Sequence, residues 1–512
     1  MRTAAAAALG AAACVCHGMG CTVGQDYARP NVLPPGPTFK SPATQPASVA
    51  NVPADWWTLF GDPVLDELQK QAAVASPTAQ AAAARLTQAR AAARATYADL
   101  FPTLSFEPSI ERARTPANAS GSGTVLGGTN GTGAVAANTA GRARTRNTTR
   151  IPFDLSYELD VFGRVRRGVE AARAQVGASV ADYEVVLQTV RADVATNYFA
   201  LRGLDLQQTI FDQTVQSYRR QVELTAKQFS AGVVSRLDVA QANAQLKTTL
   251  AQQTDIRRQR ADLEHALATL VGRTPAEVDL AVRPLDLAPP IVPAGLPSDL
   301  IRRRPDVAYA EQNLIAANAQ IGVAIAAFYP QFQLTGSAGL ESFNVSDAFN
   351  WQQRVWSLGA GLTLPLFDAG RIQANVDQAK ARYEELLADY RQAVLTAVRD
   401  VEDALTDLRL RAEQAESQKQ AVDASREYVE LSQRQYERGL VGYFTVIDAE
   451  RTLLDNELSA AQTLNQRLAS TVLLVKSLGG GWEPGPELSG GSGEGGSGST
   501  AGTAGAAQPA GR

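Results

Sequence analysis

Residues that could catalyse a reaction or bind a metal are scarce in this chain. It has two histidines, His17 and His265, and His17 lies in what we interpret as a leader. A metal site built on imidazoles or a Ser-His dyad needs histidine beside other ligands or a nucleophile, and one remaining histidine does not predict either. The glycine-rich stretches contain no P-loop pattern. We therefore expect no catalysis, no cofactor and no metal.

The three cysteines, Cys14, Cys16 and Cys21, all fall at the start of the chain, which favours a processing signal over a disulfide. Arg2 and the alanine-rich run that follows it predict a short secretory signal over residues 1–20. The residues before Cys21 are small and resemble a bacterial lipobox, although glycine stands where leucine is preferred. Cys21 would then be acylated, with palmitate as a typical chain, and become the mature N-terminus. Ordinary cleavage around residues 11–13 is the alternative.

Charged residues are interspersed along the chain, and the net charge is −4. This composition does not predict nucleic acid binding, and most charges are expected to lie on solvated helix faces. Asp448 and Arg451 are three residues apart, so a helix would place them on one face. The plain interpretation of this pair is a surface ion pair.

The chain contains an internal duplication. A second copy repeats the first at an offset of 207 residues, and a stretch further upstream repeats at an offset of 228. Such self-similarity indicates that one structural unit is built twice. The matched positions include Gly163 and Gly370, Tyr183 and Tyr390, Gly232 and Gly439, and Gly272 and Gly479.

Each copy contains a long stretch without proline, between Pro152 and Pro275 and between Pro365 and Pro484. Apolar residues recur there at steps of three and four, the spacing of helices that pack side by side. The first stretch predicts a helix from Arg164 to about Phe229, roughly 100 Å long at about 1.5 Å per residue. The second copy predicts a matching helix.

Before each long helix, two stretches alternate apolar and polar residues, which predicts strands with one apolar and one polar face. The polar positions of the first copy are conspicuously acidic, as at Glu111, Asp154 and Glu158. The apolar positions are Leu104, Phe106 and Ile110 in the first stretch, and lie within residues 151–161, 332–340 and 356–366 in the others.

Two turns join long helices. Gly232 is expected to take the positive φ that ends one helix, and Ser235 with Asp238 has the capping-box spacing that starts the next. In the second copy Gly439 matches Gly232, and Thr445 with Asp448 has the same capping spacing.

No apolar run of about 18 residues follows the leader, so any membrane crossing would have to use β-strands. Four strands do not close a barrel, which needs about eight or more. Two chains would supply eight strands and three chains twelve. Three are favoured, because twelve long helical elements could then continue the barrel as a wide tube.

Three motifs occur in order along the duplicated chain: residues 21–30 (CTVGQDYARP), 295–306 (GLPSDLIRRRPD) and 366–371 (LFDAGR). On these motifs, and from Cys21 to about Trp482, the chain resembles TolC/OprM-type outer-membrane factors, in the branch of NodT-like outer-membrane efflux lipoproteins. The resemblance implies an α+β membrane protein of the cell outer membrane, lipid-anchored and extending into the periplasm. It implies a homotrimer with a twelve-stranded transmembrane β-barrel, a long periplasmic α-helical barrel and a mixed equatorial region.

The resemblance also implies a passive exit duct of a tripartite efflux pump for drugs or other small molecules. Its partners would be a periplasmic membrane-fusion adaptor, an inner-membrane resistance-nodulation-division transporter and outer-membrane lipids. A duct for type I protein secretion is the near alternative. A periplasmic coiled-coil scaffold would explain the long helices, but not the alternating hairpins or the secretory signal.

The resemblance assigns roles to single residues. Asp448 would line the tube axis as a periplasmic gate, and Arg451 would help to hold neighbouring helices together. The adaptor would contact the turns at Gly232, Val234, Ser235, Gly439 and Val441.

The expected organisation follows from these assignments. It comprises a lipoprotein signal peptide (1–20), an acylated extended segment (21–54), a first repeat (55–272) with an equatorial helix, a β-hairpin (101–162) and long helices (164–272), a connector (273–300), a second repeat (301–482) with a β-hairpin (329–367) and long helices (371–479), and a disordered tail (483–512).

Overall fold

The computed structural model of the protein describes residues 22–32, 53–115, 144–290, 292, 303–483 and 485. The chain divides into two compact units. The first, here the strand unit, comprises Met1–Asp26, Arg90–Arg173 and Ile315–Glu384. The second, here the helix unit, comprises Tyr27–Ala89, Ala174–Leu314 and Glu385–Arg512. None of the helices in the described ranges is long and apolar enough to cross a membrane.

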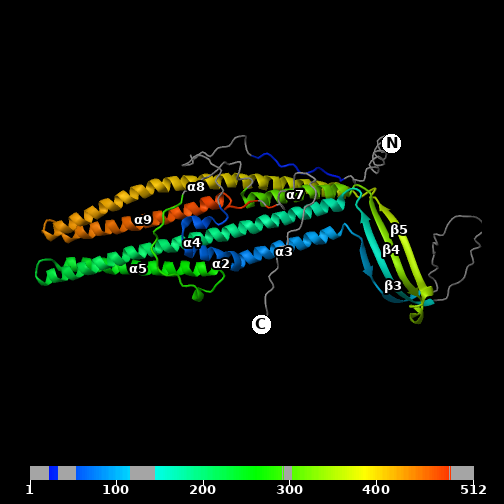
Figure 1. Ribbon diagram of the computed structural model, residues 1–512, viewed down its shortest axis with the longest axis horizontal. Coiled ribbons are helices and arrows are strands. Elements are labelled where there is room, and N and C mark those ends of the chain that lie inside the picture. The colour runs from blue at the N-terminus through cyan, green and yellow to red at the C-terminus, as the bar shows by residue number, and fades with distance from the viewer. Residues whose placement is uncertain are drawn as a thin grey trace, which may run out of the picture. The chain divides into compact units, whose positions relative to one another are not determined.

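The strand unit contains one antiparallel sheet in the order β1-β3-β4-β5, with β2 also paired to β3 (Figure 1). The short 3-10 turns η4 (Val345–Asp347) and η5 (Trp351–Gln353) lie between the last two strands. The strands are β1 (Thr103–Phe106), β2 (Ser109–Thr115), β3 (Arg144–Leu159), β4 (Gln331–Ser342) and β5 (Arg354–Thr363).

Two expected strands are wrong in their limits. The first is divided into β1 and β2, because Pro108 has no N–H to donate to β3. The register is nevertheless continuous, since Phe106 lies opposite Phe153 and Ser109 opposite Arg150. The last strand ends at Thr363, short of residue 366, and the next proline is Pro365.

The register sorts the strand residues onto two faces. The apolar face carries exposed hydrophobic side chains from every strand: Leu104, Phe106, Ile110, Phe153, Leu155, Leu334, Trp356, Leu358 and Leu362. The polar face holds the predicted acidic residues Glu111, Asp154 and Glu158, but it also holds Arg146 and Arg150. The expectation of an acidic polar face is therefore wrong at the end where β2 and β3 meet their connecting segment, because arginines balance the carboxylates there.

The long helices confirm the prediction from the proline-free stretches. α4 (Arg164–Ser230) and α8 (Arg371–Glu437) have 67 residues each, and α5 (Arg236–Leu270) and α9 (Tyr443–Ser477) have 35 each. All four pairs of limits differ by 207 residues, the offset of the duplication. The remaining helical elements are η2 (Trp56–Phe60), α2 (Pro63–Ala75), α3 (Pro77–Ala98), η3 (Pro275–Glu277) and α7 (Pro305–Ala326).

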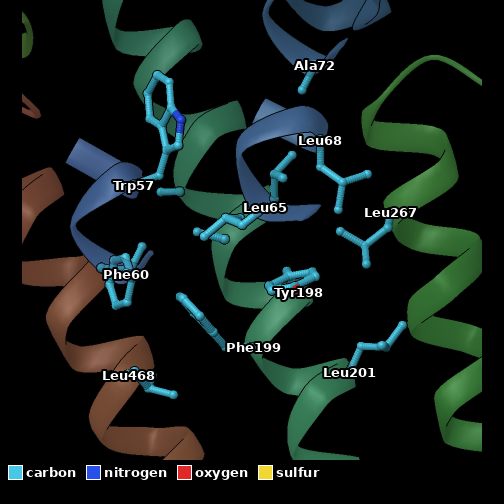
Figure 2. Close-up of a cluster of buried hydrophobic side chains, with 14 of the residues drawn as sticks. Trp57, Phe60, Leu65, Leu68, Ala72, Tyr198, Phe199, Leu201, Leu267 and Leu468 are labelled. Atoms are coloured by element: carbon cyan, nitrogen blue, oxygen red, sulfur yellow. The ribbon is translucent and has the colours of Figure 1, made fainter. Parts of the chain in front are cut away.

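The core of the helix unit gathers around α2 and the middle of α4 (Figure 2). Phe60 packs against Phe199 with ring centroids 4.7 Å apart. The Tyr198 hydroxyl donates a 2.6 Å hydrogen bond to one carboxylate oxygen of Asp62, and the other oxygen accepts from the Val64 N–H at the start of α2. One buried carboxylate thus caps α2 and attaches it to α4, which satisfies polar groups that would be costly to bury unpaired.

Candidate functional site

The candidate site is the end of the helix unit where α4 turns into α5 and α8 turns into α9 (Figure 1). At the first turn Gly232 has a φ of 75°. Its N–H donates to the Phe229 carbonyl, and the Val233 N–H donates to the Gln228 carbonyl, both at 2.9 Å. These bonds satisfy carbonyls that the end of α4 leaves free, and the positive φ favours glycine.

Ser235 starts α5 as predicted. Its hydroxyl accepts from the Asp238 N–H at 3.3 Å, while the Asp238 carboxylate accepts from the Ser235 N–H at 2.9 Å. This reciprocal pair is a capping box, and it satisfies two N–H groups at the helix start.

The second turn repeats the glycine but not the cap. Gly439 has a φ of 72°, and its N–H and that of Leu440 bond back to Tyr436 and Gln435. The predicted Thr445–Asp448 capping box is wrong, because α9 begins at Tyr443 with Gly442 as its N-cap and no side-chain cap. The offset of 207 already relates Gly442 to Ser235, so the duplication was the better guide than the local spacing.

The turns expose apolar side chains that the sequence interpretation missed. Val233 and Leu440 are 71% and 69% exposed, and Leu237 and Phe444 are 64% and 66% exposed. Each pair is related by the offset of 207. The predicted contact residues Gly232, Ser235 and Gly439 are exposed, while Val234 and Val441 are half-buried. The signal that could have found the four exposed residues is the recurrence of an apolar residue directly after each turn glycine and four positions later.

A small buried cluster holds the second turn in place. Ala242 of α5 packs with Tyr443, Val446 and Ile447 of α9, and Val222 and Tyr436 lie against them. The Tyr436 and Tyr443 rings have centroids 5.6 Å apart. The Tyr436 hydroxyl also donates a 2.8 Å hydrogen bond to the Gln228 side chain, which joins the end of α8 to the end of α4.

Asp448 points away from this cluster and is exposed. One of its carboxylate oxygens accepts a 3.3 Å hydrogen bond from the Tyr428 hydroxyl of α8. Desolvation and the bond to Asp448 raise the pKa of Tyr428. Arg451 is also exposed, and in the described part of the chain no ion pair joins it to Asp448. The expected Asp448–Arg451 surface pair is therefore wrong, and Tyr428 takes its place.

Glu450, two residues further along α9, is a buried carboxyl that the sequence interpretation missed. It is 7% exposed, and one oxygen accepts from Ser217 of α4 at 3.4 Å and from Gln433 of α8 at 3.2 Å. The other oxygen is buried without a hydrogen-bond partner. Burial raises the pKa of Glu450. The sequence could have indicated this burial, because Glu450 falls at helical steps of three and four from the buried residues Val446, Ile447 and Leu454.

Cys21 lies outside the described residues, but the segment that follows it has defined contacts in the strand unit. The Val23 N–H donates to the Phe162 carbonyl at 3.1 Å. Arg167 donates to the Val23 and Gly24 carbonyls and pairs with Asp26 at 2.8 Å. Within the helix unit, Arg29 pairs with Glu311 of α7.

Comparisons with known proteins agree on one family. A sequence model described as Outer membrane efflux protein matches residues 68–273 and 296–480. The probable efflux pump outer membrane protein TtgC of Pseudomonas putida is 34% identical over 471 residues, which cover 90% of this chain and 93% of the relative.

Two solved structures show the same fold. The outer-membrane channel OprN has a TM-score of 0.81 at 29% identity, covering 90% of this chain and 99% of that one. The open state of the Neisseria gonorrhoeae MtrE outer membrane channel has a TM-score of 0.77 at 29% identity, covering 91% and 99%.

The buried carboxyl gives a prediction of pH-dependent stability. Because the folded-state pKa of Glu450 is raised, its stabilising contribution is complete below the unfolded value of about 4.3 and is lost as the pH rises through the folded value. We expect Glu450→Gln to raise the thermal midpoint of the detergent-solubilised protein at pH 7.5 by about 2 °C. The gain should disappear near pH 4. Glu437→Gln, at an exposed position of α8, is the control. A gain of the same size at both pH values would contradict the assignment.

Proposed function

The chain belongs to the outer membrane efflux protein family, and from this premise we propose that three copies assemble into one channel that conducts small molecules out of the periplasm. The observation that carries the proposal is the sheet of the strand unit. Its apolar face is exposed, and its edge strands, β1 with β2 on one side and β5 on the other, have no further neighbour among the described residues.

An exposed apolar face with open edges fits a membrane barrel completed by other chains. In lipid every backbone N–H and C=O must be paired, so an open sheet has to close through its edges. Three copies would give a barrel of about twelve strands, within the range of known barrels. The four long helices of each copy would continue it as a tube in the periplasm. An eight-stranded dimer would leave fewer helices to enclose that tube.

The tube would be a passive duct. We propose that an inner-membrane resistance-nodulation-division transporter supplies the energy and that a periplasmic membrane-fusion adaptor joins it to the duct. The adaptor would bind the exposed apolar residues of the two turns, Val233, Leu237, Leu440 and Phe444, together with the predicted Gly232, Val234, Ser235, Gly439 and Val441. Burying these exposed side chains against a partner would be favourable, because it removes their apolar surface from water.

We propose that Asp448 narrows the duct near this end, with Arg451 beside it on the same exposed stretch of α9. Three copies of an exposed carboxylate would form an acidic ring, which favours cations and repels anions. The hydrogen bond from Tyr428 supports the role, because it fixes the carboxylate on α9 to the neighbouring helix α8.

Cys21 is proposed as the lipid anchor. The contacts of the residues just after it support this role, because the Val23–Phe162 bond holds the segment close to the end of β3 and the start of α4. A Cβ on Gly163, whose φ is 81°, would lie 2.5 Å from the Thr22 side chain. Thr22 therefore packs directly against the Gly163 backbone, which leaves no room for a side chain there. An acyl chain on Cys21 would then start near the end of the sheet at which β3 leads into α4.

The gate assignment predicts a change in conductance. Asp448→Ala should raise the single-channel conductance of the trimer in planar bilayers, because it removes charge and volume from the constriction. Tyr428→Phe should raise it less, since the carboxylate remains but loses its hydrogen bond. Asp255→Ala, at an exposed carboxylate of α5, should leave conductance unchanged. Wild-type conductance in Asp448→Ala would remove this residue from the gate, and failure of the wild-type protein to form channels would contradict the duct itself.

The adaptor assignment predicts a loss of efflux without a loss of folding. Val233→Glu and Leu440→Glu place charges on exposed apolar positions, so the trimer should form normally. Binding to the adaptor should weaken by about tenfold for each change. The measurement is drug susceptibility of a strain that lacks its own outer-membrane efflux protein and carries each variant. Val74→Glu, at an exposed position of α2, is the control. Full resistance in both turn variants would contradict the proposed contact.

The anchor assignment predicts the mass of the mature protein. The wild-type N-terminal peptide should begin at Cys21 and carry a diacylglycerol and an amide-linked acyl chain, as measured by mass spectrometry. Cys21→Ser should lose these groups, whereas Cys16→Ser should keep them. An unmodified mature protein that begins near residues 11–13 would overturn the assignment.

A further inference from the structure

The charges on the apolar face of the sheet are distributed unevenly. Pairing places Arg112 opposite Asn147, Arg114 opposite Thr145 and Arg354 opposite Leu340, so all three arginines share the face of Phe153 and Trp356. No acidic residue of the described strands falls on this face in the observed register. Each arginine lies near the end of its strand that meets a strand-to-strand connection, here the loop end.

These arginines differ from those of the polar face in what they contact. Arg150 pairs with Glu341 at 3.4 Å, and the Arg146 guanidinium lies 3.4 Å from the centroid of the Phe343 ring. Arg112 and Arg114 are exposed, and within the described ranges neither has an ion pair. Arg146 and Arg150 of the polar face thus have partners on or next to β4, whereas Arg112 and Arg114 of the apolar face are available to an external anion.

Aromatic residues flank the third arginine along the chain, with Trp351 before it and Trp356 after it. The Arg354 guanidinium lies 5.0 Å from the centroid of the Trp351 ring, and one of its nitrogens donates to the Trp351 carbonyl at 3.4 Å. Trp356, two residues along β5 on the same face, is 76% exposed. Proceeding along β5 from its helix end, the face therefore changes from aliphatic to tryptophan to arginine.

That order matches one half of a membrane. Aliphatic side chains suit the acyl chains, tryptophan favours the interface, and arginine binds phosphate through paired N–H donors. Because β3 and β5 lead into the long helices from their other ends, the proposed function places the loop end at the outer surface. Resting on that function, we propose that Arg112, Arg114 and Arg354 bind the phosphate groups of the glycolipid in the outer leaflet of the outer membrane.

The test uses the full-length purified trimer in detergent, with diphosphorylated lipid A as the probe. Wild-type protein should bind it at least about tenfold more tightly than dephosphorylated lipid A, since each arginine near a membrane surface contributes several-fold. The triple variant R112Q/R114Q/R354Q should lose this preference. The double variant R146Q/R150Q, on the opposite face of the same sheet, should retain it. Affinity is measured from the ligand dependence of the thermal midpoint, and folding from the heat-modifiable migration of the trimer.

The outcomes separate this inference from the channel function. A wild-type protein that conducts in planar bilayers but binds both forms of lipid A equally would overturn the inference and leave the channel intact. A triple variant that keeps the wild-type preference would also overturn it. Equal affinity of the wild type for phosphatidylglycerol would reject the outer-leaflet glycolipid as the occupant. Absence of channel conductance in the wild type would instead reject the proposed function.

Discussion

The pairing of backbone N–H and C=O groups is the constraint on which the rest of the structure depends. β3 and β4 are paired on both sides, but β1, β2 and β5 have one unpaired edge within the described residues. The apolar side chains on one face of this sheet are exposed, and water is a poor environment for them. In lipid, however, each unpaired backbone group at a strand edge would cost several kcal/mol. In the proposed assembly, closure by further copies would pair these edges while the apolar face lies in lipid, and it would also bring the four long helices of each copy together.

The duplication then explains why the helices end where they do. Their limits follow the offset of 207 residues, and both turns use a glycine with positive φ. The starts of the following helices differ, because Ser235 has a reciprocal cap and Gly442 has none. The start of α9 is held instead by burial of Tyr443 against its neighbours. The second turn therefore depends on packing with other helices, whereas the first is stabilised within its own sequence.

Most of the fold could be predicted from sequence because its signals are periodic and long. Proline-free stretches predicted α4 and α8, and alternation predicted the strands. The site was predicted less well, since helix starts and side-chain pairs there depend on contacts with other helices, which the local sequence does not contain. Thr445 had the spacing of a cap, but burial of Tyr443 fixes the helix start three residues earlier, with Gly442 as the N-cap. Asp448 could pair with Arg451 by spacing alone, and its partner is Tyr428 from another helix.

Asp448 and Glu450 show how much of a carboxylate's role is set by the helix face that carries it. Two positions correspond to about 200° around an α-helix, so the two side chains point in nearly opposite directions. Asp448 is exposed and hydrogen-bonded to Tyr428, while Glu450 is enclosed by uncharged groups of α4 and α8. Burial raises the pKa of Glu450 and so favours its neutral form, which reduces the charge inside the helix packing. The two neighbouring carboxyl groups of α9 therefore differ in what they contact, because Asp448 faces solvent and a tyrosine hydroxyl whereas Glu450 faces uncharged groups of two other helices.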